Sequence, residues 1–233
     1  MGKVIFARQE LMKDEDLFSE TCRRNSFCLC CNCAFCSHCC FYHHVHDWGG
    51  QTMAKVGLDA GGRPVFPTHT VKGVNIMQCM VEEMVKRDYT ARLVRDAFCL
   101  YCAKSFCADV CSHHDHHRRL GLPGDAVLRV EQRGGRPCVR CTGTEWWTSH
   151  MDMALGDPVH EGVDEQGRYY ELLPVLRRQP GTCMQCGIRL HWDDDDDTHC
   201  SHRCADIYLK ELDERRRRRE ARHAALRPPP GNN

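Results

Sequence analysis

The chain has no excess of charge of either sign. Its 233 residues contain 32 lysines and arginines and 32 aspartates and glutamates, which gives a formal net charge of zero. Such a chain has no overall field that would attract nucleic acid or a membrane surface. We therefore expect any charged partner to be met by a local patch of charge.

Long apolar runs are also missing. No stretch approaches the roughly 20 consecutive apolar residues that a membrane-spanning helix needs. The opening residues MGKVIFARQELMKDED contain no secretory signal and turn acidic early. Phe6 stands where a myristoylation motif has Ser or Thr. These absences predict an intracellular protein without a membrane partner.

Apolar material for a core is scarce as well. The hydrophobic fraction is 42%, but this figure includes nineteen cysteines, and only 8% of the residues are aromatic. A domain with so thin an apolar interior needs covalent or metal staples. A secreted disulfide scaffold is one way to supply them. The lack of a signal and the fifteen interleaved histidines favour metal binding instead.

Two copies of one cysteine/histidine array are present. The first covers Phe27–His46 and the second covers Phe98–His117. Both begin with Phe-Cys-Leu, both have Phe immediately before the third cysteine of the pattern, and both end in paired histidines. The candidate metal ligands are Cys28, Cys31, Cys36, Cys39, His43 and His46 in the first array and Cys99, Cys102, Cys107, Cys111, His114 and His117 in the second.

A third set of cysteines lies near the C-terminus and is complete in itself. It consists of two pairs, Cys183-x2-Cys186 and Cys200-x3-Cys204, which together supply the four ligands of a structural zinc site. The loop between the pairs contains the acidic run Asp193–Asp197. We interpret this run as a solvated loop tip rather than as a second cation site.

The residue types explain the choice of metal. A Cys-x2-Cys pair can place two thiolates in one tight turn, each about 2.3 Å from a shared Zn²⁺ ion. A His-x2-His pair puts two imidazoles on one face of a helical turn. Four such ligands close the coordination shell, which predicts a structural rather than a catalytic role. We expect at least about three Zn²⁺ ions per chain.

The order of the pairs within an array allows two ways of sharing ions. Adjacent pairing would join Cys28 and Cys31 to Cys36 and Cys39. Interleaved pairing would join the first cysteine pair to the two histidines and would leave the second pair for another ion. We favour the interleaved form, because the four residues between the cysteine pairs give the chain little room to bring both turns round one ion.

The second ion of each array needs upstream ligands, and these are incomplete. Cys22 precedes the first array and Cys79 precedes the second, as possible ligands. Asn25 and Glu82 stand where a second upstream ligand is expected. The side chains that could substitute are Cys30, Cys33, Cys40 and His44 in the first array and His69, His113 and His116 in the second.

Cys138 and Cys141 form an isolated Cys-x2-Cys pair. Two interpretations stay open for these possible metal ligands. They could be a half-site that His150 or His160 completes, or they could be unliganded cysteines.

The apolar pattern predicts few regular elements. Helical spacing extends over 74–100, and a second helix should run from near Cys200 to about Leu226. Short strands are expected at 126–130 and 167–174. The predicted fold is a small, zinc-stapled α+β structure. Its expected segments are an N-terminal tail or short helix at 1–20, the first array at 21–50, a Gly/Pro-rich linker at 51–78, a zinc domain at 79–205 with the second array at 98–120 and the four-cysteine site at 183–204, and a basic helix with a disordered tail at 206–233.

The second array, the segment Asp125–Val130, the strand at 169–173 and the last four cysteines together resemble the plant AT-rich sequence- and zinc-binding (PLATZ) family. His117-Arg-Arg-Leu120 matches the sequence that often follows the family's array. The resemblance covers about residues 79–205, and the first array resembles the family's array again. Both arrays are similar to B-box zinc modules, whose pairing is interleaved. The resemblance implies a nuclear, zinc-dependent transcriptional regulator, usually a repressor, that binds A/T-rich double-stranded DNA.

Basic residues that could serve this function gather in two places. The run Arg215–Arg219 lies on the predicted C-terminal helix and could pair with phosphates or act as a nuclear-import signal. Its alternative is a solvated helix whose charge is balanced by neighbouring acids. A second basic zone consists of Arg118, Arg119, Arg129, Arg133, Arg136 and Arg140. Arginines that enter a narrow minor groove would fit a preference for A/T-rich DNA.

Two other classes of function compete with DNA binding. A B-box-like module that binds protein partners suits the zero net charge. An enzyme is not expected: the sequence has no His-Glu-x2-His motif for zinc hydrolysis, and a RING-type ligase needs a final Cys-x2-Cys where these arrays have His-x2-His. We therefore expect no small-molecule substrate.

Overall fold

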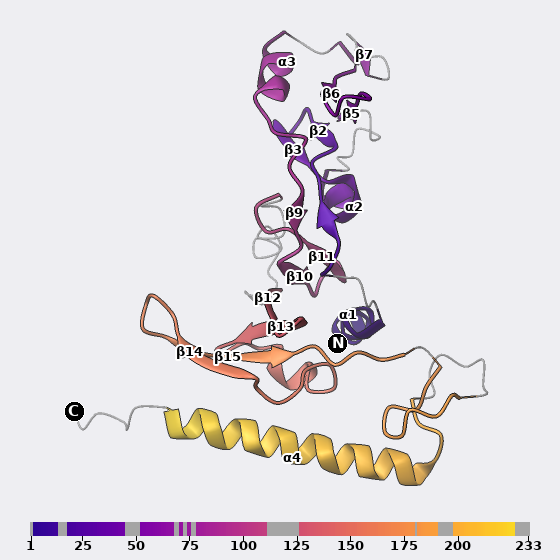
Figure 1. Cartoon of the computed structure of the whole chain (residues 1–233), viewed down its shortest axis with the longest axis vertical. Helices are drawn as coiled ribbons and strands as arrows, with labels where there is room; N and C mark the ends of the chain where they lie inside the picture. Colours follow the sequence, from indigo (N-terminus) through magenta and orange to yellow (C-terminus); the bar gives the residue numbers. More distant parts are fainter. Residues whose placement is uncertain are drawn as a thin grey trace. The chain divides into compact units, whose positions relative to one another are not determined.

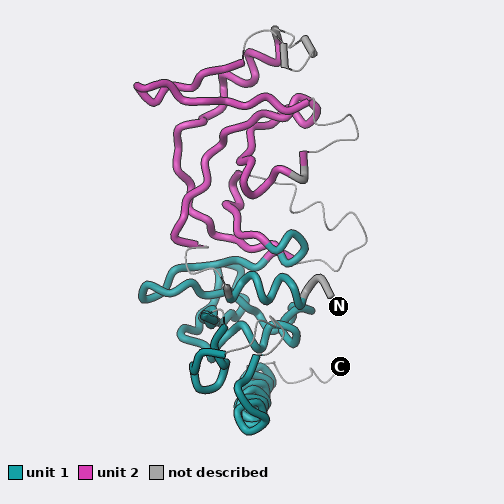
Figure 2. Tube along the Cα trace, turned by 90° about the vertical axis from the view of Figure 1, so that its right-hand side faces the viewer, with its two compact units in different colours: residues 1–15, 100–103, 128–233 teal, residues 16–99, 104–127 magenta. Residues whose placement is uncertain are grey.

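The computed structural model describes residues 2–13, 18–44, 52–67, 70–71, 74–75, 78–110, 126–179, 181–190 and 198–226. Its elements are short, apart from one long helix near the C-terminus (Figure 1). The predicted small mixed α/β architecture with a C-terminal helix is confirmed. Contacts divide the chain into two units (Figure 2), one containing residues 1–15, 100–103 and 128–233 and the other containing residues 16–99 and 104–127.

The unit that contains residues 16–99 is built from strands of two or three residues and short helical turns. Its elements are β1 (Thr21–Cys22), β2 (Ser26–Cys28), β3 (Cys33–Phe35), α2 (Ser37–Cys40), the 3-10 helix η1 (Phe41–His44), β4 (Met53–Lys55), β5 (Gly57–Leu58), β6 (Pro64–Val65), β7 (Thr70–Val71), β8 (Val74–Asn75), α3 (Gln78–Val85), β9 (Leu93–Val94), β10 (Ala97–Cys99) and β11 (Lys104–Phe106).

The two arrays form the same β-hairpin. β2 pairs with β3 and β10 pairs with β11 in the same register. Phe27 and Phe98 take equivalent positions, with a constant offset between the repeats (98 − 27 = 71), and both are fully buried. The turns match too, because Asn32 and Ala103 both have a φ of 51°. The sequence repeat is therefore also a structural repeat.

The segment after each hairpin is anchored in the same way. Asn25 Oδ1 accepts a hydrogen bond of 2.8 Å from the backbone N–H of Ser37. Its counterpart, Asp96, accepts one of 2.8 Å from the N–H of Ala108 through Oδ1. Asn25, which stands where an upstream ligand was expected, thus positions the chain next to the third cysteine of the array.

The strands that lead into the two hairpins pair with each other. Cys22 of β1 lies opposite Leu93 of β9 in an antiparallel pair. These two residues are also repeat counterparts (93 − 22 = 71). A residue that faces its own counterpart is what a local two-fold axis produces, so the repeats are related by an approximate two-fold axis at this strand pair.

Two arginines make reciprocal contacts across this axis. Arg24 Nη2 donates to the carbonyl oxygen of Asp109 at 3.1 Å. Its counterpart, Arg95, places Nη2 3.3 Å from Nδ1 of His38, which is the counterpart of Asp109. Each repeat therefore sends a guanidinium to the same place on the other, although the acceptor atoms differ.

The predicted helix over 74–100 is wrong in extent. The helix α3 covers Gln78–Val85 only. Asp88 follows it and forms a turn, because its Oδ1 accepts hydrogen bonds from the backbone N–H groups of Thr90 and Ala91. Met84 packs into a buried cluster with Phe27 of the first hairpin. Local side-chain hydrogen bonds therefore end a helix that the apolar spacing would have continued.

The other unit contains an antiparallel sheet with the strand order β12-β13-β15-β14. The expected strands at 126–130 and 167–174 are present as β12 and β15. The sheet elements are β12 (Val127–Arg133), β13 (Arg136–Cys141), β14 (His160–Val163) and β15 (Tyr169–Pro174), and the unit also has α1 (Gly2–Lys13), a 3-10 helix η3 (Thr148–His150) and α4 (His202–Leu226).

The long helix α4 runs along one face of this sheet (Figure 1). Residues on that face of the strands, among them Leu128, Val139 and Leu173, are fully buried. The helix contributes Tyr208 and Leu212 as buried residues. The prediction of a helix from near Cys200 to Leu226 is confirmed.

Candidate metal centres

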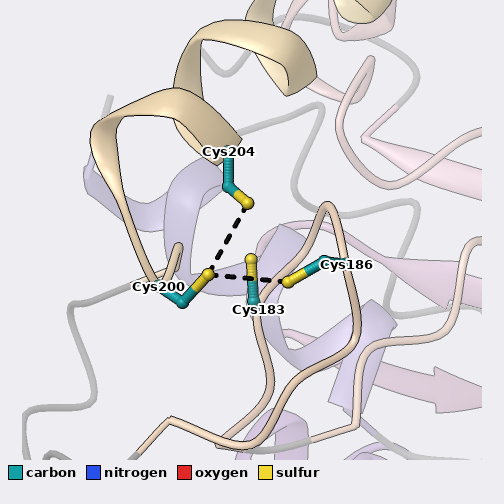
Figure 3. A group of neighbouring side chains, drawn as sticks. All are labelled: Cys183, Cys186, Cys200 and Cys204. Carbon is teal, nitrogen blue, oxygen red and sulfur yellow. Dashed lines mark hydrogen bonds between the residues drawn. The ribbon is translucent and has the colours of Figure 1, made fainter.

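The four cysteines near the C-terminus converge as the spacing predicts (Figure 3). Cys183 and Cys186 lie on one turn, whereas Cys200 precedes α4 and Cys204 lies in its first turn. The Sγ atoms of Cys186 and Cys200 are 3.5 Å apart, and those of Cys200 and Cys204 are 3.6 Å apart. A tetrahedron of sulfurs about 2.3 Å from zinc has edges of about 3.8 Å. The set therefore has the size of a Zn²⁺ site.

The backbone of this turn stabilises the thiolate form of Cys183. Gly187 has a φ of 72°, which lets the chain fold back so that the N–H of Cys183 donates to the carbonyl of Ile188 at 2.8 Å. Burial by itself raises the pKa of the Cys183 thiol. Backbone N–H groups of Cys186, Cys200 and Gln185 donate to its sulfur and outweigh burial, which lowers the pKa to about 6. A thiolate is the form that binds metal.

A second group consists of Cys28, Cys31 and His44, whose ligand atoms all lie within 4.8 Å of one another. The backbone N–H of Cys31 points at Cys28 Sγ over 3.4 Å, and Asn32 follows in the left-handed conformation. His44 is fully buried, and its ring stacks on that of Phe35 with 3.8 Å between centroids. The packed ring is thus fixed beside the two sulfurs.

The histidine in this group is not one of the two chosen from the sequence. His43 is in η1, but its side chain lies outside the described residues, and so does all of His46. His44, which the spacing offered only as a substitute ligand, is the imidazole that faces Cys28 and Cys31. Adjacent histidines cannot be told apart by spacing, because the sequence does not show how the 3-10 helix turns them.

A third group joins Cys22 to Cys36 and Cys39. All three are buried, and the sulfurs of Cys22 and Cys39 are 3.7 Å apart. Hydrogen bonds from the thiols of Cys22 and Cys39 lower the pKa of Cys36 well below its usual range. Arg95, which is buried and hydrogen bonded to Cys22, supplies a positive charge beside it.

These two groups together have the interleaved arrangement. The first cysteine pair meets a histidine from beyond the second pair, and the second cysteine pair meets Cys22 from upstream. Adjacent pairing, which would join all four cysteines of the hairpin region, is not what the structure brings together. The reason is the hairpin itself, because β3 carries the chain away from the turn that holds Cys28 and Cys31 before Cys36 is reached.

The second array keeps only part of this design. Cys99 and Cys102 flank the same kind of turn, and Ala103 has the left-handed conformation of Asn32. Leu93 and Val110, however, occupy the positions of Cys22 and Cys39. Within the described ranges, no group of three metal-ligating side chains includes a cysteine of this array. Three of its predicted ligands, Cys111, His114 and His117, lie outside the described residues.

Three possible ligands are not brought to a site among the described residues. Cys79 is exposed on α3. Cys138 and Cys141 are three apart on β13, so their side chains point to opposite faces of the sheet. Cys141 Sγ instead donates to a carboxylate oxygen of Glu145 at 3.4 Å. The half-site interpretation of Cys138 and Cys141 is therefore corrected. Cys-x2-Cys spacing is also compatible with a strand, and here both thiols are buried on β13.

Acidic side chains of the same unit engage the arginine run of α4. Arg219 Nη1 lies 2.7 Å from Asp152 Oδ1, and Arg216 Nε lies 2.8 Å from Asp152 Oδ2. Arg218 pairs with Asp157 at 2.8 Å. Arg215 Nη1 donates to the backbone carbonyl of Asp152 at 3.2 Å. Much of the run thus fastens the helix to its own unit.

Glu171 of β15 completes this fastening. Its side chain is fully buried, and its two oxygens meet Arg222 Nε at 3.1 Å and His223 Nε2 at 3.2 Å. A buried carboxylate needs such partners, because leaving it unpaired costs several kcal/mol. Asp152 and Glu171 belong to no sequence motif, and they acquire their role only through the packing of α4 against its unit.

These features define a small mixed α/β protein with three cysteine or cysteine/histidine groups positioned to hold metal ions, consistent with zinc. Comparison with known proteins found no matching family model, no matching curated protein and no matching solved structure. Among the described helices, none combines the length and apolar character that a membrane crossing requires.

Proposed function

We propose that this protein is a zinc-dependent, DNA-binding transcriptional regulator of the PLATZ type, acting in the nucleus with a preference for A/T-rich DNA. Its zinc ions are structural, and its two repeats are B-box-like modules. The observation that carries the zinc part is the convergence of three ligand groups, two of them interleaved in one repeat. The DNA part rests on the resemblance of the arrays and on arginines that are exposed on the surface.

The metal chemistry supports a structural role. A set of four cysteine ligands gives zinc a closed shell, which leaves no coordination position for water or substrate. The ligands come from separate elements: a turn, a strand, a helix end and a 3-10 helix. A bound ion would therefore join segments that the thin apolar core cannot hold, and it would stabilise the fold by on the order of 10 kcal/mol in a small module.

The proposal is tested by gel-shift titration of the full chain against A/T-rich and G/C-rich duplexes of equal length, with and without a zinc chelator. We expect a shift that favours the A/T-rich duplex, falls as salt is raised and disappears on chelation. A shift of equal size for both duplexes removes the sequence preference. No shift with zinc-loaded protein removes the DNA-binding function.

A second candidate function is a zinc-stapled module that binds protein partners without contacting DNA. One observation favours it: Arg216, Arg218 and Arg219 of the most basic segment are paired with acids of the same unit. Partner capture with zinc-loaded protein, compared with chelated protein, would support this candidate if the same preparation gives no shift with either duplex.

A further inference from the structure

The basic surface of this protein lies on the sheet face that points away from α4. In antiparallel strands, paired residues share a face, and successive residues along one strand lie on opposite faces. Glu171 and the buried Leu173 therefore face α4. Arg140, opposite Leu172 in the β13–β15 pair, faces the other way, as does Arg133, which pairs with Arg136. We call this second surface the ribbon face.

Four arginines lie on the ribbon face of β12 and β13, namely Arg129, Arg133, Arg136 and Arg140. One acidic residue, Glu131, shares that face on these strands. Its Oε1 accepts from Arg140 Nε at 2.8 Å, and Arg140 also lies 3.7 Å over the ring of Tyr170. Four positive charges against one negative charge give this face a local excess that the zero net charge of the chain conceals.

Three of these arginines differ in partners from Arg216, Arg218 and Arg219 of α4, which are paired with acids, and in exposure from Arg219, which is buried. Arg129, Arg133 and Arg136 are exposed, and among the residues that the structure describes none of them forms an ion pair with an acid. Arg133 Nη2 instead lies 3.3 Å from Nδ1 of His160, another basic group. The guanidinium groups are thus turned to solvent, whereas Arg219 of α4 is buried against Asp152.

The turn between the strands presents this charge at a tip. Gly134 and Gly135 both have positive φ, of 56° and 74°, as a tight two-residue hairpin turn requires. Arg133 and Arg136 flank the turn as a directly paired couple. A two-stranded ribbon of this kind is narrow enough to enter the major groove of duplex DNA or to lie along a phosphate backbone.

From this placement we infer that the ribbon face, through Arg129, Arg133 and Arg136, contacts the phosphate backbone of double-stranded DNA, and that the arginine run of α4 does not. The inference rests on the proposed DNA-binding function and assigns a surface to it. Charge complementarity favours duplex DNA as the partner of the ribbon face. Guanidinium groups bind phosphate oxygens in bidentate fashion, and duplex DNA has a continuous row of phosphates.

The test is the salt dependence of binding, measured by fluorescence anisotropy with the full zinc-loaded chain and a labelled A/T-rich duplex. The ribbon variant carries Arg129→Gln, Arg133→Gln and Arg136→Gln. The control variant carries Arg92→Gln, Arg177→Gln and Arg217→Gln, three exposed arginines elsewhere with the same change of charge. A third variant replaces the ribbon arginines with lysine. Zinc content and circular dichroism establish that each variant is folded.

Each phosphate contact contributes about 0.9 to the slope of log K against log salt concentration. We expect the ribbon variant to lose about 2 to 3 from the steepness of that slope, while the control variant and the lysine variant keep the wild-type slope. A ribbon variant that retains the wild-type slope overturns the inference, and so does a control variant that loses as much. If the wild-type chain binds no duplex at all, the proposed function fails first and the inference falls with it.

Discussion

Cys22 and Leu93 face each other in the β1–β9 pair, and they are the same position of two repeats. One is a buried sulfur within 4.8 Å of two others, and the other is an apolar side chain that cannot bind metal. The same replacement occurs a second time, where Val110 stands in the place of Cys39. Among the described residues, the local two-fold axis thus relates a repeat with a three-sulfur group to one in which two of the three equivalent positions are not cysteine. We predict that the two repeats differ in metal content.

This asymmetry predicts a gain-of-site experiment. Replacing Leu93→Cys and Val110→Cys together supplies two sulfurs to Cys107, the counterpart of Cys36. We expect zinc content to rise by about one ion per chain, measured by elemental analysis of purified protein. The single variant Leu93→Cys is the control and should leave the content unchanged. An unchanged content in the double variant would contradict the proposed equivalence of the two repeats.

Removal of metal should unfold much of the chain. Because closed zinc shells supply on the order of 10 kcal/mol to small modules, exhaustive chelation should abolish the tertiary signal in near-ultraviolet circular dichroism. Readdition of Zn²⁺ should restore it. Wild-type protein should contain at least about three Zn²⁺ ions per chain, and a chelated protein that kept its tertiary signal would refute the structural role of the metal.

Ligand cysteines should matter more than neighbouring cysteines outside the metal groups. Cys204→Ser removes one of four converging sulfurs and should release one zinc ion, with a lower thermal midpoint. Cys30→Ser changes an exposed position outside the three groups, and it should retain all the metal. Measured by zinc release and thermal unfolding, equal losses in the two variants would mean that the wrong sulfurs have been chosen.

Asp152 is predicted to anchor α4. Its carboxylate is only 5% exposed and meets Arg219, which is 7% exposed, at 2.7 Å. Asp152→Ala leaves buried guanidinium charge uncompensated, so it should lower the free energy of unfolding by about 3 to 5 kcal/mol, measured by urea denaturation.

The matched control is Asp157→Ala. That carboxylate also pairs with an arginine of α4, at 2.8 Å, but the two partners, Asp157 and Arg218, are 45% and 51% exposed. Exposed pairs contribute at most about 1 kcal/mol, so this change should have a small effect. Equal destabilisation by the two substitutions would argue against a buried anchor at Asp152.

Asp164 should titrate below an ordinary aspartate. The backbone N–H of Arg168 donates to its Oδ1 at 2.8 Å and opposes the effect of burial, with help from the side chain of Arg168 and the N–H of Gln166, so the pKa lies below 3.8. A lowered folded-state pKa means that its contribution to the β14–β15 turn is present above pH 3.8 and is lost as pH falls through the folded value. Carboxyl NMR titration should show this, and a midpoint at or above 3.8 would contradict it.

Short-range chemistry was readable from the sequence. Cys183, Cys186, Cys200 and Cys204 converge as their spacing predicts, because a Cys-x2-Cys turn is closed by a few backbone hydrogen bonds and needs no distant partner. The repeat of the two arrays was visible for the same reason. Interleaved pairing followed from the shortness of the four-residue link.

Contacts between residues that are far apart in the sequence could not be predicted from local spacing. The placement of His44 beside Cys28 and Cys31 depends on how a 3-10 helix turns beside Phe35. The contact of Cys141 with Glu145 depends on its being in a strand. The sequence predicts a binding surface at the arginine run. In the structure, arginines of α4 pair with Asp152 and Glu171, whose carboxylates are buried and require cations. The sequence alone therefore determined which side chains can bind metal, because that is a property of residue type and local spacing. Tertiary structure decided which of them meet and which arginines stay exposed, because burial and pairing of charge depend on what the fold places opposite them.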